Sequence, residues 1–144
     1  DIRSEDFIIS DGIYDEILKT AFKTFYYQRC GQAKVAPYAQ TGFTDGASHS
    51  QDATCRFIND QNNASLYKDM TGGWYDAGDY NKYVNFAYKP IHDLLWSYEI
   101  NPQAWASDAM NIPESNNGIP DLLDEVKYVK PEKKKPPPTL PPLL

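Results

Sequence analysis

The stretch GGWYDAGDYNKYV, residues 72–84, is the most informative part of this 144-residue chain. It places two carboxylates, Asp76 and Asp79, around Gly78, a residue type that adopts backbone angles others avoid. If Asp79 caps a following helix, the preceding loop can turn Asp76 toward the same point. Two carboxylates aimed at one point can hold a water molecule and remove its proton, which is general-base chemistry. The stretch therefore indicates either half of a hydrolytic site or simple capping and turn chemistry.

Aromatic side chains interleave with these two carboxylates. Trp74 and Tyr75 precede them, and two further tyrosines follow. An aromatic ring combines a broad apolar face with a polar edge, which suits stacking on a sugar ring. We therefore expect Trp74 and Tyr75 to bind a carbohydrate substrate. A calcium loop is the alternative use of the acids, but the ligand spacing of an EF-hand is not met.

The composition of the chain excludes several functions. Hydrophobic residues make up 41% and charged residues 24%, with room for one ordinary domain. No run approaches the roughly 18 apolar residues that cross a bilayer, so no membrane partner is expected. The net charge is −6, and because lysines are concentrated at 127–135, the rest of the chain is strongly acidic. An acidic surface does not neutralise phosphates, so no nucleic-acid partner is expected.

Three segments show the spacing of apolar side chains that is typical of amphipathic helices. The first is predicted over residues 12–30, with Asp11 as its N-cap. The second is predicted over residues 83–98, where Pro90 either kinks the helix or lies in its first turn. The third begins at Pro120. No strand-rich section is visible, so the sequence predicts an all-α fold.

The segments outside these helices lack periodicity. Residues 32–73 are rich in Gly, Asp, Asn, Ser and Thr, and long ordered loops of this kind often carry function. Residues 131–144 contain six of the 11 prolines and cannot continue a helix. We expect them to form a disordered tail, which is either a natural linker or a truncation scar. Residues 1–10 contain a short apolar run at 7–9 and suit the end of a preceding module.

Three helices do not close a core by themselves. We expect their apolar faces, which carry Phe22, Leu94 and Leu122, to require further helices. The chain therefore reads as part of a larger helical domain.

A second motif, NIPESNNGIPDLLDEVK at residues 111–127, is a Pro- and Gly-rich turn that leads into the third helix. Asp121, Asp124 and Glu125 fall in the first turn, where the helix dipole favours anions. Glu114 precedes the helix and has no capping role that we can assign.

A weaker set of candidate ligands comprises Cys30, Asp45, His49 and Cys55. Zinc binds about four N, S or O ligands, usually including a closely spaced pair of cysteines, and no such pair occurs. The two cysteines fit a disulfide, a pair of buried thiols or part of a metal site. A histidine in a polar loop is more often a hydrogen-bonding surface residue.

The motifs at 72–84 and 111–127 together resemble the N-terminal part of the catalytic domain of glycoside hydrolase family 9 cellulases. The segment FKTFYYQRCG, residues 22–31, is similar to the end of the first helix of that family. The segment DFIISDGIYDEIL resembles the junction with an upstream immunoglobulin-like module. The resemblance implies a module end or linker at 1–10 and part of a family 9 catalytic domain at 11–130.

The resemblance implies an incomplete (α/α)6 barrel with long irregular loops, and an enzyme that cleaves internal β-1,4-glucosidic bonds of cellulose or related β-glucans with inversion. Asp79 matches the catalytic base of the family, and Asp76 matches the residue that holds the attacking water. Inversion also needs an acid, which in the family is a Glu far toward the C-terminus, and no segment here resembles its surroundings. We therefore expect this chain alone to be inactive. The alternative is a non-catalytic carbohydrate-binding or structural module.

Some members of the family hold a structural zinc through a cysteine and a downstream Cys-His pair. Cys30 and His49 match two of these ligands, but Ser48 stands where the paired cysteine is expected. No cofactor is expected for catalysis. The resemblance also implies secretion, a β-glucan partner, and neighbouring immunoglobulin-like or carbohydrate-binding modules.

Overall fold

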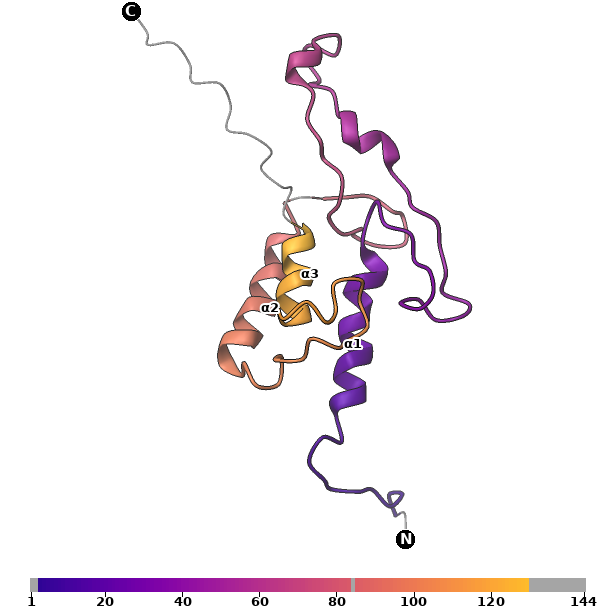
Figure 1. Ribbon diagram of the computed structural model, residues 1–144, viewed down its shortest axis with the longest axis vertical. Helices are drawn as coiled ribbons and strands as arrows, with labels where there is room; N and C mark the ends of the chain where they lie inside the picture. The colour runs from indigo at the N-terminus through magenta and orange to yellow at the C-terminus, as the bar shows by residue number, and fades with distance from the viewer. Residues whose placement is uncertain (1–2, 84, 130–144) are drawn as a thin grey trace, which may run out of the picture.

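The computed structural model of the chain describes residues 3–83 and 85–129. Its described part is helical with long irregular loops, as Figure 1 shows, and it contains no β-strand within those ranges. Three isolated antiparallel bridges join loop segments. The all-α prediction is therefore confirmed. The elements are α1 (Asp15–Gln28), two short 3-10 turns (Ser50–Thr54 and Ala64–Leu66), α2 (Tyr88–Ile100) and α3 (Asp121–Val129).

Helix α1 starts later than its apolar pattern suggested. The amide of Asp15 bonds to the carbonyl of Gly12, which has a positive φ, so a tight turn precedes the helix. Tyr14 occupies the N-cap position without a side-chain hydrogen bond, so the prediction of Asp11 as the cap was wrong. The helix ends at Gln28 because Arg29 adopts an extended conformation and joins a bridge with Trp74.

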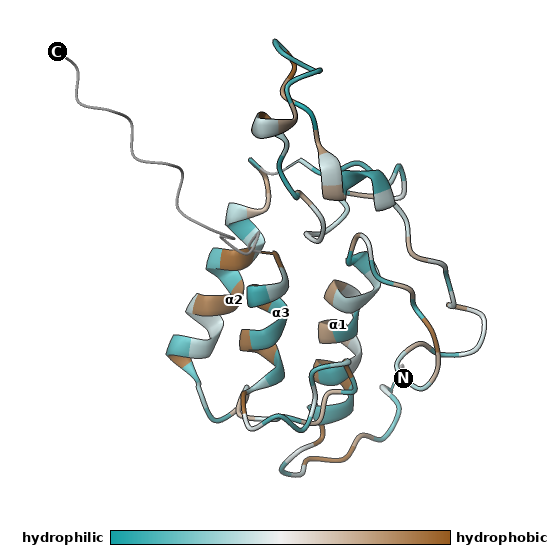
Figure 2. Cartoon of the chain, turned by 45° about the horizontal axis from the view of Figure 1, so that its top comes forward, coloured by the Kyte–Doolittle hydropathy of each residue, from teal (hydrophilic) through white to brown (hydrophobic). Residues whose placement is uncertain are grey.

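A proline lies at the start of both α2 and α3. Pro90 lies in the first turn of α2, where its missing amide interrupts no intrahelical bond, and this confirms one of the two alternatives. Pro120 directly precedes α3, as predicted. Figure 2 shows apolar positions alternating with polar ones along all three helices. Among the described residues, no helix is long and apolar enough to cross a membrane.

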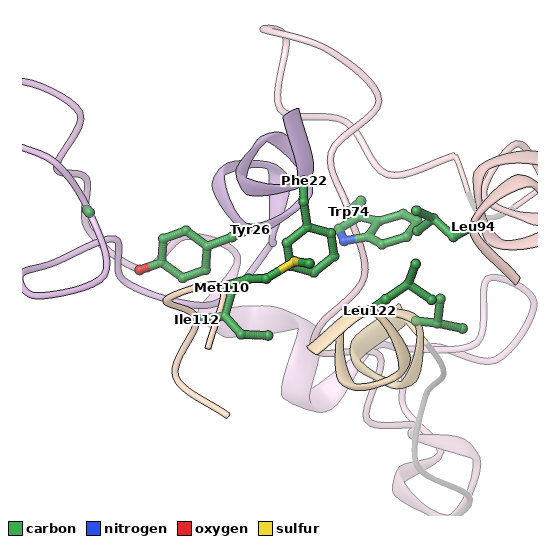
Figure 3. Close-up of a cluster of buried hydrophobic side chains, with 9 residues drawn as sticks. Phe22, Tyr26, Trp74, Leu94, Met110, Ile112 and Leu122 are labelled. Carbon is green, nitrogen blue, oxygen red and sulfur yellow. The ribbon is translucent and has the colours of Figure 1, made fainter. Parts of the chain in front are cut away.

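The core lies where α3 packs against both α1 and α2. Phe22 of α1 and Leu122 of α3 are both buried, and in Figure 3 the loop residue Trp74 lies between the side chains of Phe22 and Leu94. Burying such large side chains contributes about 1.5–3 kcal/mol each. The buried hydrophobic cluster consists of Phe22, Tyr26, Ala39, Trp74, Leu94, Met110, Ile112, Leu122 and Val126.

Large apolar side chains nevertheless remain exposed on two helices. Ile17 of α1 is 62% exposed, and Trp96 and Ile100 of α2 are 56% and 68% exposed. Phe22, Leu94 and Leu122, by contrast, are covered within the chain itself, so the prediction that the apolar faces need further helices was wrong for these three side chains.

The predictions for the two terminal segments differ in outcome. Residues 3–10 form no helix or strand, and Phe7 is 77% exposed. Their assignment to a preceding module stays a prediction. The prediction for residues 131–144 lies outside the described residues.

Candidate active site

The two candidate catalytic carboxylates lie on a loop that α1 anchors. We call residues 72–83 the DAGD loop. The amide of Cys30 donates to the carbonyl of Gly73 at 2.8 Å, and the amide of Tyr75 donates to the carbonyl of Gln28 at 2.8 Å. These bonds lay the start of the loop antiparallel to the residues that end α1. The hydrogen bonds to the end of α1 stop at Tyr75, so Asp76 is the first residue of the loop beyond them.

The DAGD loop is closed at its base by a lysine. The Nζ atom of Lys82 donates to the carbonyl oxygens of Met70 at 2.8 Å and Gly72 at 3.2 Å, and it pairs with Asp52. A charged donor shared by two carbonyls and a carboxylate is a strong, directional tie. The tip of the loop, with Asp76 and Asp79, projects beyond this tie.

Both carboxylates are exposed, and Asp79 caps no helix, because α2 begins only at Tyr88. Of the alternative of capping and turn chemistry, the capping part is therefore wrong, whereas Asp79 does make the local bond of a turn to the amide of Asn81. One oxygen of Asp79 accepts the amide of Asn81 at 3.2 Å, and the other accepts its side-chain Nδ2 at 2.8 Å. Hydrogen bonds from the backbone and side chain of Asn81 lower the pKa of Asp79, because they favour the charged carboxylate.

Trp74 and Tyr75 are more buried than a sugar-stacking platform requires, at 9% and 6% exposure. The indole Nε1 of Trp74 donates to Glu125 at 2.8 Å, and the hydroxyl of Tyr75 bonds to Ser48. Both side chains do line a pocket of about 180 Å³ together with Asp76. They thus line a pocket that includes one of the two carboxylates, and their assignment to substrate binding stays a prediction.

Exposed aromatic rings flank the same loop. Tyr80 and Tyr83 are 45% and 44% exposed. Tyr83 also lines the pocket beside Asp76, with Phe86 from the turn before α2 and Pro90 from the first turn of that helix. The pocket is therefore lined by rings and one carboxylate, a combination that suits a sugar ring.

A buried ion-pair network contacts the DAGD loop through the side chain of Trp74. The guanidinium of Arg29 donates through Nε to both oxygens of Glu125 at 3.1 Å, and through its other nitrogens to Glu114 at 3.1 and 2.9 Å. Arg29 and Glu125 are fully buried, and Glu125 also accepts the indole of Trp74. We call these four residues the Arg29 network.

The Arg29 network corrects the interpretation of the second motif. Glu125 does not serve the helix dipole: it lies in the core and pairs with Arg29. Glu114, which had no assigned role, is the second carboxylate of the network. Arg29 itself carried no signal in the sequence, since its partners lie 85 and 96 residues away.

The candidate zinc ligands do not form a zinc site. Cys30 is buried without a disulfide, and the ring of His49 lies 5.7 Å from that of Tyr75. Ser48 bonds to the Tyr75 hydroxyl, and its Oγ lies 3.0 Å from Nδ1 of His49. No group of three or more His, Cys, Asp or Glu side chains that could hold a metal occurs in the described part of the chain. The donors present do not fit tetrahedral zinc.

Comparison with known proteins agrees with the fold and the loop. The family model for glycosyl hydrolase family 9 matches residues 14–130, so the chain belongs to this family. Endoglucanase D of Acetivibrio thermocellus is 40% identical over 126 residues, which are 88% of this chain and 20% of that protein. The chain spans about a fifth of the length of the curated relatives it matches.

Solved structures of the family superpose on the chain. A Bacteroides ovatus family 9 structure matches with a TM-score of 0.72 and 32% identity, over 85% of this chain and 23% of that one. A Zn-binding triple mutant of the family 9 endoglucanase J30 matches with a TM-score of 0.69 and 32% identity, over 87% and 24% of the two chains. The fold is therefore a portion of the (α/α)6 barrel of family 9, as predicted.

Proposed function

We propose that this chain carries the base half of an inverting β-1,4-glucanase site, with Asp79 as the general base and Asp76 as the residue that orients the attacking water. One observation carries the proposal: two exposed carboxylates project from a loop that is tied at its base and leads into a pocket lined by aromatic rings. A general base must be ionised before it can take a proton. The hydrogen bonds from Asn81 favour that form of Asp79.

The acid of the reaction is assigned to a residue outside the described ranges. Inversion needs a protonated carboxyl about 6.5–9.5 Å from the base, on the opposite face of the sugar. Glu114 and Glu125 are committed to Arg29. Glu125 is fully buried, and both oxygens of Glu114 accept hydrogen bonds from Arg29, so neither carboxyl is placed to protonate a leaving group.

The substrate is a β-1,4-glucan such as cellulose, and we infer that the protein acts outside the cell on this polymer. The inference is supported by the family and by a relative named endoglucanase. The pocket of about 180 Å³ beside Asp76 suits a single sugar ring stacked on Tyr83 and Phe86. Accessory modules that bind the same polymer are the partners we expect.

The decisive experiment places residues 14–130 in a complete enzyme. We would exchange the matching segment of Endoglucanase D for residues 14–130 and measure the release of reducing sugar from carboxymethylcellulose. We expect the chimera to be active and the product to have inverted configuration by proton NMR. Asp79→Asn in the chimera should abolish turnover, while Asn59→Ala, in an exposed loop, should not. Full activity of the Asp79→Asn chimera, or a retained product, would remove Asp79 from the role of base.

The isolated 144-residue chain provides the complementary test. Without an acid, protonation of the leaving group is lost, a contribution of about 10²- to 10⁴-fold. We therefore expect no sugar release above a heat-killed control. Cellulose binding by an inactive chimera would instead favour the non-catalytic carbohydrate-binding alternative.

A further inference from the structure

Asn81 contacts both residues of the proposed catalytic pair. Its backbone amide donates to one carboxylate oxygen of Asp79 at 3.2 Å, and its side-chain Nδ2 donates to the other at 2.8 Å. Its carbonyl oxygen accepts the amide of Asp76 at 2.8 Å. One residue therefore fixes the plane of the Asp79 carboxylate and, through the backbone, its position relative to Asp76.

A strained residue makes these contacts possible. Tyr80 has a φ of 61°, in the left-handed region that a bulky side chain rarely adopts. This conformation turns the chain back, so that Asn81 faces the carboxylate of Asp79. The ring of Tyr80 packs 4.7 Å from that of Tyr75, and its hydroxyl donates to Asp45 at 3.4 Å. Such strain persists only where its surroundings impose it.

We propose that Asn81 is a positioning residue for the reaction: it holds the Asp79 carboxylate in the orientation from which this group takes a proton from water. The proposal rests on the assignment of Asp79 as the base. Asn81 touches neither substrate nor water in this role and acts through Asp79. Each of its two donors occupies one lone pair on a different oxygen, which leaves the remaining lone pairs directed away from Asn81 and free to accept a proton.

A consequence for pH dependence follows from the same contacts. Hydrogen bonds to a carboxylate stabilise its charged form, and those from Asn81 lower the pKa of Asp79. The other groups around the loop tip are the carboxylate of Asp76 and the hydroxyl of Tyr80 with its partner Asp45. At the base lies Lys82, paired with Asp52. Loss of the Asn81 side-chain donor should therefore move the acidic limb of activity to higher pH.

The first test uses the 144-residue chain and does not require activity. The side-chain carboxyl carbon of Asp79 would be titrated by carbon-13 NMR in the wild type, Asn81→Ala and Asn81→Asp. Alanine removes one donor, and aspartate replaces it with a like charge of the same shape. We expect the apparent pKa of Asp79 to rise in that order, with Asn59→Ala unchanged. Because Asn81 is exposed, the three chains should share core resonances. An unchanged Asp79 titration in both variants would overturn the proposal.

The second test uses the chimera with Endoglucanase D. Asn81→Ala should lower kcat by about tenfold to a hundredfold, the scale of a misplaced reacting group, with KM within about twofold. The acidic limb of kcat/KM should move to higher pH, further in Asn81→Asp. If Asn81→Ala keeps the wild-type pH profile while Asp79→Asn is inactive, the proposed role of Asn81 is overturned and that of Asp79 is retained. Activity in Asp79→Asn, with the NMR shifts present, would overturn the proposed base instead.

Discussion

The Arg29 network and the DAGD loop are neighbouring regions that differ in the burial of their charged side chains. In the network, Arg29 and Glu125 are withdrawn completely from water and satisfied by each other, by Glu114 and by the Trp74 indole. In the loop, Asp76 and Asp79 face solvent, and Asp79 is held by one neutral residue. Trp74 belongs to both regions, since its side chain lies in the network and its backbone is part of the loop.

The comparison shows how a rigid buried frame supports an exposed reactive group. A buried ion pair holds its geometry firmly, because breaking it strands a charge in the core. A carboxylate in the same position cannot reach a substrate. The DAGD loop combines rigidity and access in different parts. Its base is fixed by the core and by Lys82, and its tip is exposed to solvent.

The largest expected effect comes from removing the buried charge of the network. Arg29→Met leaves Glu125 buried without its partner and should destabilise the chain by about 3–5 kcal/mol in urea unfolding. Arg56→Met, an exposed arginine, serves as the control and should stay within about 0.5 kcal/mol of the wild type. Equal effects of the two variants would show that the network is not a stabilising frame.

A smaller effect is expected at the base of the loop. Lys82→Met leaves the carbonyls of Met70 and Gly72 without their charged donor, at a cost of about 1–3 kcal/mol. Hydrogen exchange should accelerate at the amide of Asp76, whose bond to Asn81 closes the loop. Lys68→Met, in an exposed segment, is the matched control. Unchanged exchange at Asp76 would mean that Lys82 does not tie the loop.

The pH dependence of stability distinguishes buried from exposed carboxylates. Burial raises the pKa of Asp121, whose Oδ2 accepts the amide of Met110 at 2.6 Å and the hydroxyl of Ser115 at 2.7 Å. A folded pKa above the unfolded value of about 3.9 gives stability that is present at lower pH and is lost as pH rises through the folded pKa.

Asp121→Asn keeps an oxygen for both donors and cannot ionise. Relative to the wild type, this variant should therefore gain stability as pH rises from 4 to 7, as measured by urea unfolding at each pH. A constant difference between the two proteins would show that folding does not raise the pKa of Asp121.

The smallest effect on stability is expected at the tip of the loop. Asp79→Asn keeps the shape of an exposed side chain, so the free energy of unfolding should change by less than about 0.5 kcal/mol. The same substitution should abolish turnover in the chimera. A loss of several kcal/mol would instead make Asp79 part of the structural frame and remove the contrast between the two regions.

The sequence alone was sufficient for features set by neighbouring residues. Apolar spacing predicted all three helices, and the fixed angle of proline located the starts of α2 and α3. The composition of residues 72–84 singled out the loop with Asp76 and Asp79, and its resemblance to family 9 agrees with the family match. Asn81, two residues beyond Asp79, lay in the same motif, and its short-range bonds to an aspartate are of a kind that a sequence can suggest.

The tertiary structure decided what depends on residues distant in the chain. Glu125 lies 96 residues from Arg29 and 51 from Trp74, and no local pattern announces such partners. Packing therefore turned a helix acid into a core ion pair and brought the indole of Trp74 onto the same carboxylate. Packing also brings Ser48 and Tyr75, 27 residues apart, into a hydrogen bond in the region where a zinc site was considered. Local periodicity encodes elements because it needs only nearest neighbours, whereas the pairing of buried charges is settled only when those elements meet.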